Sequence, residues 1–593
     1  MNKSNKNDHL SRRQFVAITG GTIGLAALGS LGLMAAYQEN EREVDPADFK
    51  YQENEADVLV IGSGMAGLFA AVKAHDAGAK VMMVSKGRLG SSGLTPFAKG
   101  IFAYDEKTSK YSLDEFTEMV SRSALGTNNP VYTRQMAEHS QARVNDLKEW
   151  GFFESNLYNK AFNVPITERN IPLIERVVIT NLIKENGKIA GAAGFSLDEQ
   201  KVHFFTAKSV ILCTGAGGFK PNGFPVCDLT HDGTVMAYQI GAKVTGKEWN
   251  DGHPGRSTNP AACYDGWGDM FDQKPSTVQI EIHHDLGVDL NYQAYKRGNP
   301  VQMGPPGAEQ GEEELAGGPF VPEEFKRKGR PGSPEGEAGI KGRGPHGEGQ
   351  DRPPRPPRDG EGPPGMQGTL AGGASAGMSI HKSEGLVPIN EKCESNIPGL
   401  YAAGDALGSY MAGAIYTQIG SSLAGSAVQG AVAGEAAARY CQSIKMPTIS
   451  TSTKSTIEAQ MLAPLKREAG YSPAWVTQTL QGIMIPNFVL YIKKESMLKA
   501  ALAYVEELRD HHLPMLRAAD LHELRLAHET ANMIITAEMK LKASIMRKES
   551  RCSHYRLDYP ELDDKNWQAW INIFKGQDGT MQFEKQPFGS WTS

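Results

Sequence analysis

The sequence predicts an α/β fold built on a Rossmann-like, dinucleotide-binding domain, and three observations carry that prediction. Residues 57–61 are a short apolar, β-branched run typical of a buried parallel strand. They lead directly into Gly62-Ser63-Gly64-Met65-Ala66-Gly67, a G-x-G-x-x-G turn. A helical stretch at 68–77 and a second apolar strand at 80–85 then follow. Because a lone glycine fingerprint is weak, this order of elements is what favours a dinucleotide site over an ordinary glycine-rich turn.

The three glycines of the turn have different physical roles. Gly62 permits the tight turn, Gly64 lets backbone N–H groups approach a pyrophosphate, and Gly67 lets the helix pack closely on the strand. The phosphate is expected at the helix N-terminus, where free amides and the macrodipole favour negative charge. The intervening residues then contact the same cofactor: Ser63, Met65 and Ala66.

Length, charge and cysteine content exclude several classes of protein. A chain of 593 residues can hold three or four domain-sized units. Its net charge of −6 gives no sign of nucleic-acid binding. The six cysteines are scattered without a C-x-x-C pair, so zinc, iron–sulfur and c-type haem sites have no support and no metal site is expected.

The first 36 residues predict a twin-arginine export signal. Ser11-Arg12-Arg13-Gln14-Phe15 follows a polar, basic start and precedes an apolar, glycine-diluted stretch at 16–36. A single membrane-spanning helix is the alternative, since the length just suffices. The paired arginines and the glycines favour export, which predicts a periplasmic protein, with the segment either cleaved or retained as an anchor. Residues 37–55 are then expected to be a polar linker.

The end of the second strand narrows the choice of cofactor. It reads Ser85-Lys86, where an NAD site usually offers an acidic residue to the ribose. This ending resembles the flavoproteins of the succinate dehydrogenase and fumarate reductase family. The resemblance implies FAD, covered by the small-residue loop at 89–96 that contains Ser91, Ser92 and Gly93. Membrane-bound members carry a covalent histidine where this chain has Gly93, so noncovalent FAD is expected.

Further segments resemble FAD contacts of the same family. Residues 208–218, K-S-V-I-L-C-T-G-A-G-G, are another buried strand that runs into glycines, and T-H-D-G at 230–233 is similar to the family's T-G-D-G. Residues 397–405 resemble the closing strand of the FAD domain. The helix expected after 420 opens with small residues whose amides would polarise the flavin. The contacts implied are Thr214, Gly215, Asp232, Gly404, Asp405, Ser421, Ser422 and Leu423.

A low-complexity segment interrupts this domain. Residues 298–368 are dense in Gly, Pro, Glu and Arg, and such a composition cannot bury enough surface to offset the entropy of ordering. We therefore expect a mostly disordered insert. The resembled family has its capping domain here, which implies a two-dinucleotide-binding-fold FAD domain in two parts (56–250 and 369–445), a reduced cap at 251–368 and a helical C-terminal domain at 455–593. The cap arginine that donates a proton in the family has only weak candidates, Arg297 and Arg343.

The substrate positions of the family are only partly kept. His253 stands in a context similar to F-H-P-T-G, whose histidine binds a substrate carboxylate. Gln418 replaces the arginine of G-A-N-R-L-G, and the H-x-x-x-G-G histidine is missing where Gly368 stands. These changes favour a neutral or monocarboxylate enoate over fumarate. Tyr410 or Tyr416 is then the expected proton donor.

The C-terminal part carries the most specific resemblance. Residues 547–560, R-K-E-S-R-C-S-H-Y-R-L-D-Y-P, are similar to the R-x-E-S-R-G-x-H-x-R-x-D-x-P signature of succinate dehydrogenase, fumarate reductase, L-aspartate oxidase and adenylylsulfate reductase flavoproteins. We expect His554 and Arg556 to lie towards the flavin as catalytic candidates. Asp563 and Asp564 are expected at the surface.

The resemblance implies an FAD-dependent oxidoreductase that transfers hydride between flavin N5 and an activated C=C or similar organic acceptor. Two alternatives stay open: a flavin-bearing electron-transfer subunit without turnover, and an adenylylsulfate-reductase-like enzyme. No haem motif, iron–sulfur spacing or second nucleotide fingerprint is present. We therefore expect electrons from a separate iron–sulfur subunit or cytochrome, which would also provide any peripheral membrane association.

Overall fold

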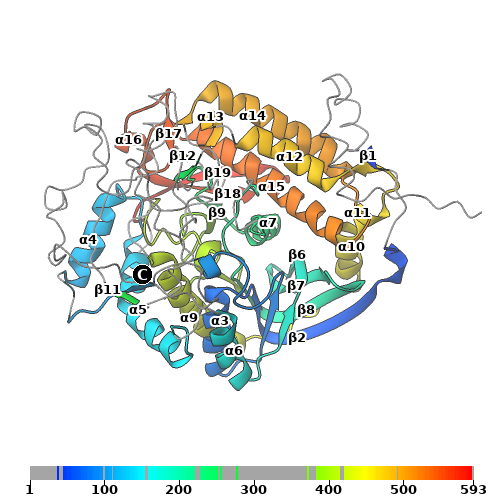
Figure 1. The fold of residues 1–593 in the computed structure, drawn as a ribbon, viewed down its shortest axis with the longest axis horizontal. Coiled ribbons are helices and arrows are strands. Elements are labelled where there is room, and N and C mark those ends of the chain that lie inside the picture. Colours follow the sequence, from blue (N-terminus) through cyan, green and yellow to red (C-terminus); the bar gives the residue numbers. More distant parts are fainter. Residues whose placement is uncertain are drawn as a thin grey trace, which may run out of the picture.

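The computed structural model places a central sheet under a layer of C-terminal helices (Figure 1). It describes residues 37–38, 44–97, 101–107, 109, 111–153, 158–220, 228–250, 254–256, 275–277, 370–372, 382–414, 420–485, 487–490 and 492–590. The export segment and the low-complexity insert predicted from the sequence lie outside these residues. No helix within the described ranges is both long and apolar enough to cross a membrane.

The main sheet confirms the predicted nucleotide-binding core. Within the described residues its strands follow the order β5-β3-β2-β8-β7-β6, and β14 pairs with β8 as a seventh strand. Strands β2, β3, β5, β8 and β14 pair in parallel, while β6 and β7 form an antiparallel hairpin that adds to β8. The bounds are β2 (Lys50–Ile61), β3 (Val81–Ser85), β5 (Leu173–Glu175), β6 (Val177–Glu185), β7 (Lys188–Ser196), β8 (Lys201–Leu212) and β14 (Leu400–Ala402).

The central strand corrects the predicted linker. Strand β2 begins at Lys50 and pairs with β8 over its whole length, from Lys50 opposite Lys201 to Ile61 opposite Leu212. Residues 50–55 therefore belong to the sheet. Their side chains are polar and mostly exposed, so the ladder of backbone hydrogen bonds left no hydrophobic signal in the sequence.

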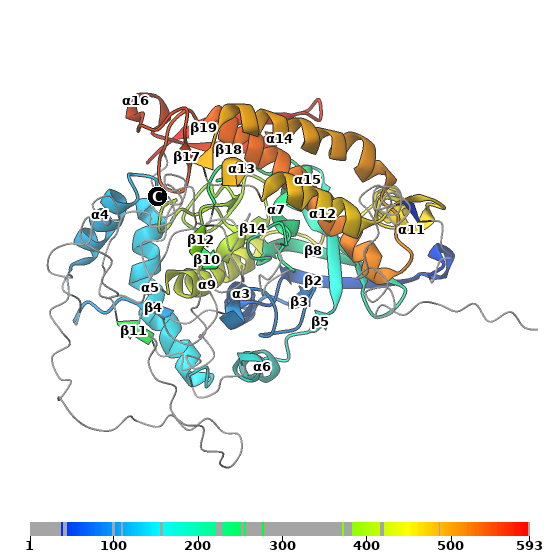
Figure 2. The ribbon, with the colours of Figure 1, turned by 45° about the horizontal axis from the view of Figure 1, so that its top comes forward.

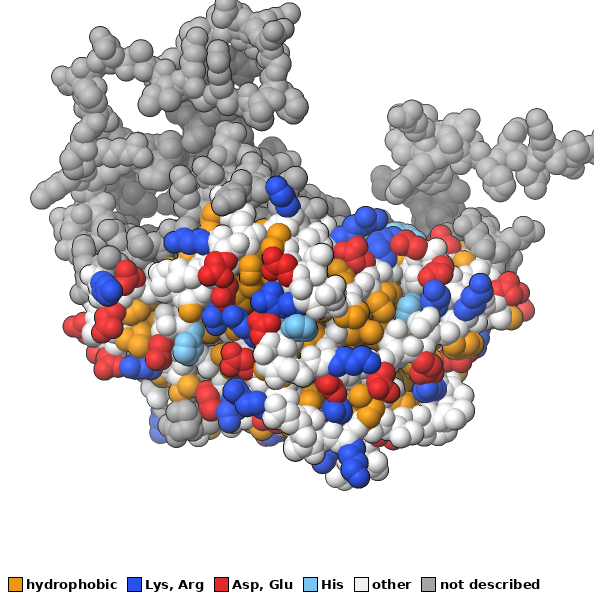
Figure 3. All heavy atoms as spheres, turned by 90° about the horizontal axis from the view of Figure 1, so that it is seen from below, with side chains coloured by type: hydrophobic (Ala, Val, Ile, Leu, Met, Phe, Trp, Pro, Cys, Tyr) orange, Lys and Arg blue, Asp and Glu red, His pale blue; other side chains and the backbone are white. Residues whose placement is uncertain are grey.

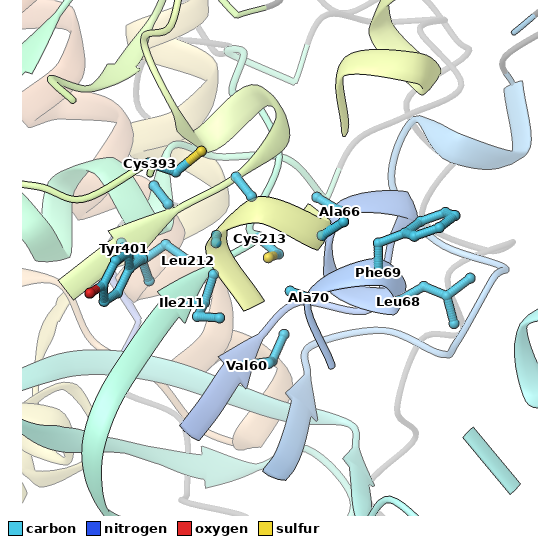
Figure 4. Packing of buried hydrophobic residues seen from close by; sticks show 14 of the residues in the cluster. Val60, Ala66, Leu68, Phe69, Ala70, Ile211, Leu212, Cys213, Cys393 and Tyr401 are labelled. Atoms are coloured by element: carbon cyan, nitrogen blue, oxygen red, sulfur yellow. The ribbon is translucent and has the colours of Figure 1, made fainter. Parts of the chain in front are cut away.

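Two helices join the separated halves of the FAD domain. Helix α3 (Met65–Asp76) follows the glycine turn, and α9 (Ser421–Gln442) packs directly against it. The close approach depends on small residues, because a Cβ on Gly430 would lie 2.3 Å from the Ala66 carbonyl oxygen. Figure 4 shows Ala70 of α3 facing Val60 of β2, whereas the Phe69 ring points away from the strands; it packs against Trp150 at 5.0 Å between ring centroids. The predicted two-part domain is thus one hydrophobic core.

Helices α4 (Leu113–Ser123) and α5 (Pro130–Glu149) follow one another along the chain between β3 and β5. Ser112 and Glu115 form a reciprocal capping box at the start of α4. Asn129 caps α5, whose first residue is Pro130. The remaining helices of this half are α6 (Tyr158–Glu168), α7 (Asp232–Gln239) and the 3-10 turns η1 (Pro46–Asp48), η2 (Thr95–Phe97) and η5 (Gly404–Ala406).

The C-terminal part is helical as predicted up to residue 567. Helices α12, α14 and α15 lie side by side above the sheet (Figures 1 and 2). The bounds are α10 (Thr451–Met461), α11 (Ala463–Lys466), α12 (Pro473–Met484), α13 (Asn487–Leu490), α14 (Glu495–Glu507), η6 (Leu508–His512), η7 (Leu513–Met515), α15 (Leu521–Met546) and α16 (Asp564–Trp567).

The last residues correct the expectation of an all-helical domain. Strands β18 (Ala569–Lys575) and β19 (Met581–Pro587) form an antiparallel hairpin around Asp578-Gly579. The hairpin joins β9 (Val244–Thr245) and β13 (Gly385–Leu386) in a second sheet, so the end of the chain is built into the FAD half. The other short strands pair as β1 (Tyr37–Gln38) with β15 (Gly470–Tyr471), β4 (Ile101–Ala103) with β11 (Pro275–Thr277), β10 (Pro254–Arg256) with β12 (Leu370–Gly372), and β16 (Ile492–Lys493) with β17 (Tyr555–Arg556).

Candidate functional site

A cavity of about 130 Å³ opens at the carboxyl ends of β2, β3 and β8. This is the edge of an open parallel sheet where ligands bind. The predicted cofactor residues that line it are Gly62, Ser63, Gly64, Met65, Ala66, Ser85, Lys86, Ser92, Gly93, Thr214, Gly215, Asp232, Gly404 and Asp405.

The glycines of the turn separate into structural and ligand-facing positions. Gly62 has φ +112°, and a Cβ there would lie 2.2 Å from the Cys213 carbonyl oxygen. A Cβ on Gly67 would lie 2.0 Å from the Gly62 oxygen, so helix and turn touch as predicted. Gly64 differs, because its φ of −79° suits any residue and its Cβ would meet only Thr95 Oγ1, at 3.2 Å. Glycine at 64 therefore keeps the turn open towards the cavity.

Two polar features of the cavity wall fit a dinucleotide. Thr214 Oγ1 is buried and has no hydrogen-bond partner among the described residues, although such groups are normally paired. Helix α3 begins at the cavity without a cap from its N-cap residue Gly64. Met65 N donates to Thr95 Oγ1 at 3.2 Å, and the next amides of the first turn need acceptors from elsewhere. Phosphate oxygens suit the helix amides, and a sugar hydroxyl or flavin heteroatom suits the threonine. The residues present thus fit FAD.

Lys86 joins the cavity to the C-terminal helices. Its Nζ lies 2.7 Å from Asp232 Oδ2 and 2.9 Å from Oε1 of Glu529, a fully buried carboxylate on α15 that also pairs with Lys220. Burial alone would lower the pKa of Lys86, but these two carboxylates raise it above its usual value. Lys86 is therefore charged and held in place. Ser85 beside it shares a 2.7 Å hydrogen bond with Ser63.

Some predicted cofactor residues do not line the cavity. Ser91 is exposed and hydrogen-bonds within its own loop, to the Arg88 carbonyl oxygen. Ser421, Ser422 and Leu423 form the first turn of α9, whose N-cap Gly420 has φ +81° and no side chain to cap the helix. Their contact with the flavin stays a prediction.

His554 and Arg556 are not where a catalytic role requires them. Both are fully buried, and neither lines the cavity. Arg556 donates to the carbonyl oxygens of Ser544 (2.7 Å) and Arg547 (3.1 Å), the free acceptors at the end of α15. His554 lies 2.9 Å from Lys493 Nζ through Nδ1 and 3.2 Å from the Arg547 oxygen through Nε2. These contacts close a helix terminus, so the expected position on the flavin side is wrong.

The outer residues of this signature lie as expected. Asp564 is exposed and pairs with Arg551 at 2.6 Å, and Asp563 caps the short helix α16.

Tyr410 is also a packing residue. Its hydroxyl lies 3.1 Å from Thr245 Oγ1 and accepts a hydrogen bond from Trp249 Nε1 at 3.3 Å. Its ring stacks on Trp570 at 5.2 Å, away from the residues that line the cavity. Burial raises the pKa of this phenol far above its usual value. The other predicted substrate and proton-donor residues lie outside the described residues: His253, Arg297, Arg343, Gly368, Tyr416 and Gln418.

A further histidine stands near the cofactor residues in the sequence. Gly385 has φ +144°, and a Cβ there would lie 2.3 Å from the carbonyl oxygen of Ala406, beside the cofactor residues 404–405. His381 stands four residues before this glycine, at the spacing of the first five positions of H-x-x-x-G-G, although Leu386 replaces the second glycine. His381 lies just outside the described residues and is a second candidate beside the assignment at Gly368, which stays a prediction.

Two family models match the chain, the FAD binding domain over residues 57–168 and the fumarate reductase flavoprotein C-terminal domain over 477–590. Among curated proteins, a fumarate reductase (CoM/CoB) chain of Methanothermobacter marburgensis is 25% identical over 556 residues, which cover 86% of this chain and 95% of that protein. The fumarate reductase flavoprotein subunit of Haemophilus influenzae is 23% identical over 599 residues, 90% of this chain and 94% of that protein.

Solved structures match over a similar length. A variant of the E. coli quinol fumarate reductase flavoprotein FrdA covers 91% of this chain and 98% of its own, with a TM-score of 0.67 and 18% identity. An adenosine-5-phosphosulfate reductase in complex with sulfite covers 92% and 98%, with a TM-score of 0.65 and 19% identity. The fold is thus shared along nearly the whole chain.

Proposed function

This chain is an FAD-dependent oxidoreductase of the fumarate reductase and succinate dehydrogenase flavoprotein family, and we propose that it reduces an activated C=C bond or a similar organic acceptor. Bound FAD supplies hydride transfer at its N5 atom. The observation that carries the proposal is the cavity beside Gly64, with its uncapped helix terminus and the unpartnered Thr214 Oγ1.

The residues of the chain hold and orient the cofactor. The amides at the start of α3 would bind the pyrophosphate, and the buried Thr214 Oγ1 would donate or accept one further hydrogen bond. The N-terminus of α9 carries partial positive charge, which would stabilise negative charge on a reduced flavin.

We propose a neutral or monocarboxylate enoate as the substrate class. Gln418 stands where the resembled family has a carboxylate-binding arginine, and a neutral amide holds a carboxylate less firmly than a guanidinium. His253 and His381 remain as the candidate groups for a single carboxylate or carbonyl oxygen.

An anaerobic assay with reduced viologen and a panel of enoates tests this class. We expect faster viologen oxidation with monocarboxylate or neutral enoates than with fumarate, and a shift towards fumarate in Gln418→Arg. His253→Gln and His381→Gln should lose turnover while they keep FAD. A clear preference of the wild-type enzyme for fumarate would reject the proposed class. Bound FAD that no enoate re-oxidises would favour an electron-transfer subunit, and re-oxidation by adenylylsulfate alone would favour an adenylylsulfate-reductase-like enzyme.

We further propose that a separate protein, an iron–sulfur subunit or a cytochrome, supplies the electrons. Several relatives are named as subunits, and Lys86 replaces the acidic residue that an NAD site usually offers to the ribose. NADH should leave the flavin oxidised, whereas dithionite or reduced viologen should bleach it. Rapid bleaching by NADH alone would contradict this.

Noncovalent FAD and export complete the proposal. Gly93 lines the cavity with open space around its Cα and has no side chain to attach, so acid precipitation should release the flavin. Flavin that stays on the denatured chain would refute this. Replacement of Arg12 and Arg13 by lysine should leave the protein in the cytoplasm, and unchanged fractionation would argue against twin-arginine export.

A further inference from the structure

Lys382 places a buried ammonium directly behind the cofactor cavity. Its side chain is 1% exposed, and Nζ forms an ion pair with the Asp405 carboxylate and a 3.0 Å hydrogen bond to Ser426 Oγ. Asp405 and Ser426 both line the cavity, the first from η5 and the second from α9. Lys382 itself does not line it. The Lys382 ammonium thus contacts two elements of the cavity wall, η5 and α9, without lining the cavity itself.

The backbone conformation of Lys382 is unusual. Lys382 has φ +65°, in the left-handed region that L-residues rarely adopt. Its carbonyl oxygen accepts a 2.7 Å hydrogen bond from the Tyr410 amide, which fixes the segment. Its stem runs beside Gly425 of α9, where an added Cβ would lie 3.3 Å from Lys382 Cε. Backbone strain and a tight helix contact at one residue indicate a constrained function at this position.

The ion pair with Lys382 affects the charge and the orientation of the Asp405 carboxylate. The side chain of Asp405 is only 10% exposed, and a buried carboxylate without a cation is either protonated or repels a nearby anion. A dinucleotide is itself an anion, and reduction of its flavin adds further negative charge. Lys382 reduces this conflict, because its ammonium lies against the carboxylate, orients it and offsets its charge.

We propose that Lys382 is a positioning residue that presents Asp405 to FAD as a fixed hydrogen-bond acceptor, tightens FAD binding and favours the reduced flavin. A carboxylate accepts hydrogen bonds from cofactor hydroxyls through both of its oxygens. A group that is already fixed also avoids the entropy cost of ordering on binding. The inference depends on FAD binding and is independent of the substrate class proposed above.

A double-mutant cycle with Lys382→Met and Asp405→Asn tests the proposal. FAD is titrated into the apoproteins, and the midpoint potential of the flavin is measured in the loaded proteins. We expect Lys382→Met to weaken the FAD Kd on the order of tenfold to a hundredfold, because the Asp405 carboxylate loses its ammonium partner, and to make the potential more negative. The double variant, which removes both charges of this ion pair, should lie closer to wild type than Lys382→Met in both measurements. Lys382→Arg should retain the potential.

The matched control is Lys392→Met, which removes an exposed lysine from the same segment and should change neither value. Unfolding in urea checks that each apoprotein is folded. Wild-type Kd and potential in a folded Lys382→Met protein, or strictly additive effects in the double variant, would overturn the proposal. If Lys382→Met does not fold, Asp405→Asn carries the test, and an unchanged potential and Kd in that variant would equally reject it.

Discussion

The cofactor cavity and the C-terminal segment at 547–564 both gather polar groups, but their hydrogen bonding differs. In the cavity, Thr214 Oγ1 is buried without a partner in the described part of the chain, and α3 has no side-chain cap. In the C-terminal segment, the Arg547 guanidinium binds Glu248 at 2.9 Å, Glu549 at 2.9 Å and the carbonyl oxygens of residues 567 and 569. A binding site leaves polar groups for a ligand, whereas a scaffold pairs them within the protein.

The difference shows that charge density alone does not identify an active site. The segment at 547–560 is densely charged, yet Arg547 and Arg556 bind helix carbonyls and buried carboxylates. The cavity wall combines glycine, serine and threonine with apolar side chains and only a few charged ones. The surface supports the same conclusion, because acidic and basic side chains are interspersed over the face shown in Figure 3 and do not mark a site.

The largest effect is expected from Arg547→Met, which tests whether the C-terminal segment is a scaffold. It leaves two buried carboxylates without their shared cation, and such losses cost about 3–5 kcal/mol of unfolding free energy. Urea unfolding should show this loss with and without FAD. Lys548→Met is the matched control, because Lys548 is exposed and its removal should change stability by less than about 0.5 kcal/mol. Equal stability of the two variants would contradict the scaffold role.

A somewhat smaller effect is expected from Gly62→Ala, which tests the structural glycine of the cavity. Its left-handed φ costs about 1–2 kcal/mol and the clash with the Cys213 oxygen about 1–3 kcal/mol. Gly93→Ala is the comparison, because φ is also positive there but the space is open, so only the first cost applies. The account fails at this point if thermal or urea unfolding finds the two variants equally destabilised.

The smallest effect is expected from a substitution of His231, a buried residue next to Asp232 of the cavity wall. Its Nδ1 lies 2.9 Å from Glu384, a buried carboxylate that also faces Lys247 and Lys540. Burial lowers the pKa of His231 to about 4, although Glu384 acts in the opposite direction. The unfolded chain binds a proton near pH 6.5 and the folded chain only near pH 4, so stability falls as pH drops through this window.

His231→Asn should therefore flatten the acid loss of stability between about pH 6.5 and pH 4, by up to about 3 kcal/mol. Asparagine tolerates the left-handed backbone at this position, where φ is +62°. Glu384 titrates below this window in both proteins, because burial would raise its pKa but the two lysines hold it well below the usual value. Parallel pH profiles of the unfolding free energy would show that His231 does not titrate as proposed.

The sequence was sufficient to predict the turns and strands that depend on local geometry. The turn at 62–67 and the closing strand at 400–402 have fixed roles within a few residues, so their patterns sufficed. The hairpin at 569–587 also left a signal, an alternating pattern around Asp578-Gly579, which the charged surroundings obscured.

Partners distant in sequence could not be predicted. Lys86 binds Glu529, a residue 443 positions away, and Arg556 binds helix carbonyls that only the tertiary fold brings to it. No periodicity or spacing encodes such pairs. The catalytic assignment of His554 and Arg556 failed for this reason, whereas His381 could have been named as a candidate from its fixed spacing to Gly385 in the sequence.

The central claim is that the glycine at 64 serves the cofactor and not the fold. FAD titration of the Gly64→Val apoprotein, with urea unfolding of the same sample, tests it directly. The backbone at 64 has an ordinary φ and an added Cβ meets only Thr95 Oγ1, at 3.2 Å, so the unfolding free energy should stay within about 1–2 kcal/mol of wild type. FAD affinity should fall more than about a hundredfold, because the added methyl groups block the approach of the pyrophosphate to the helix amides. Stoichiometric FAD in a folded Gly64→Val protein would contradict the account.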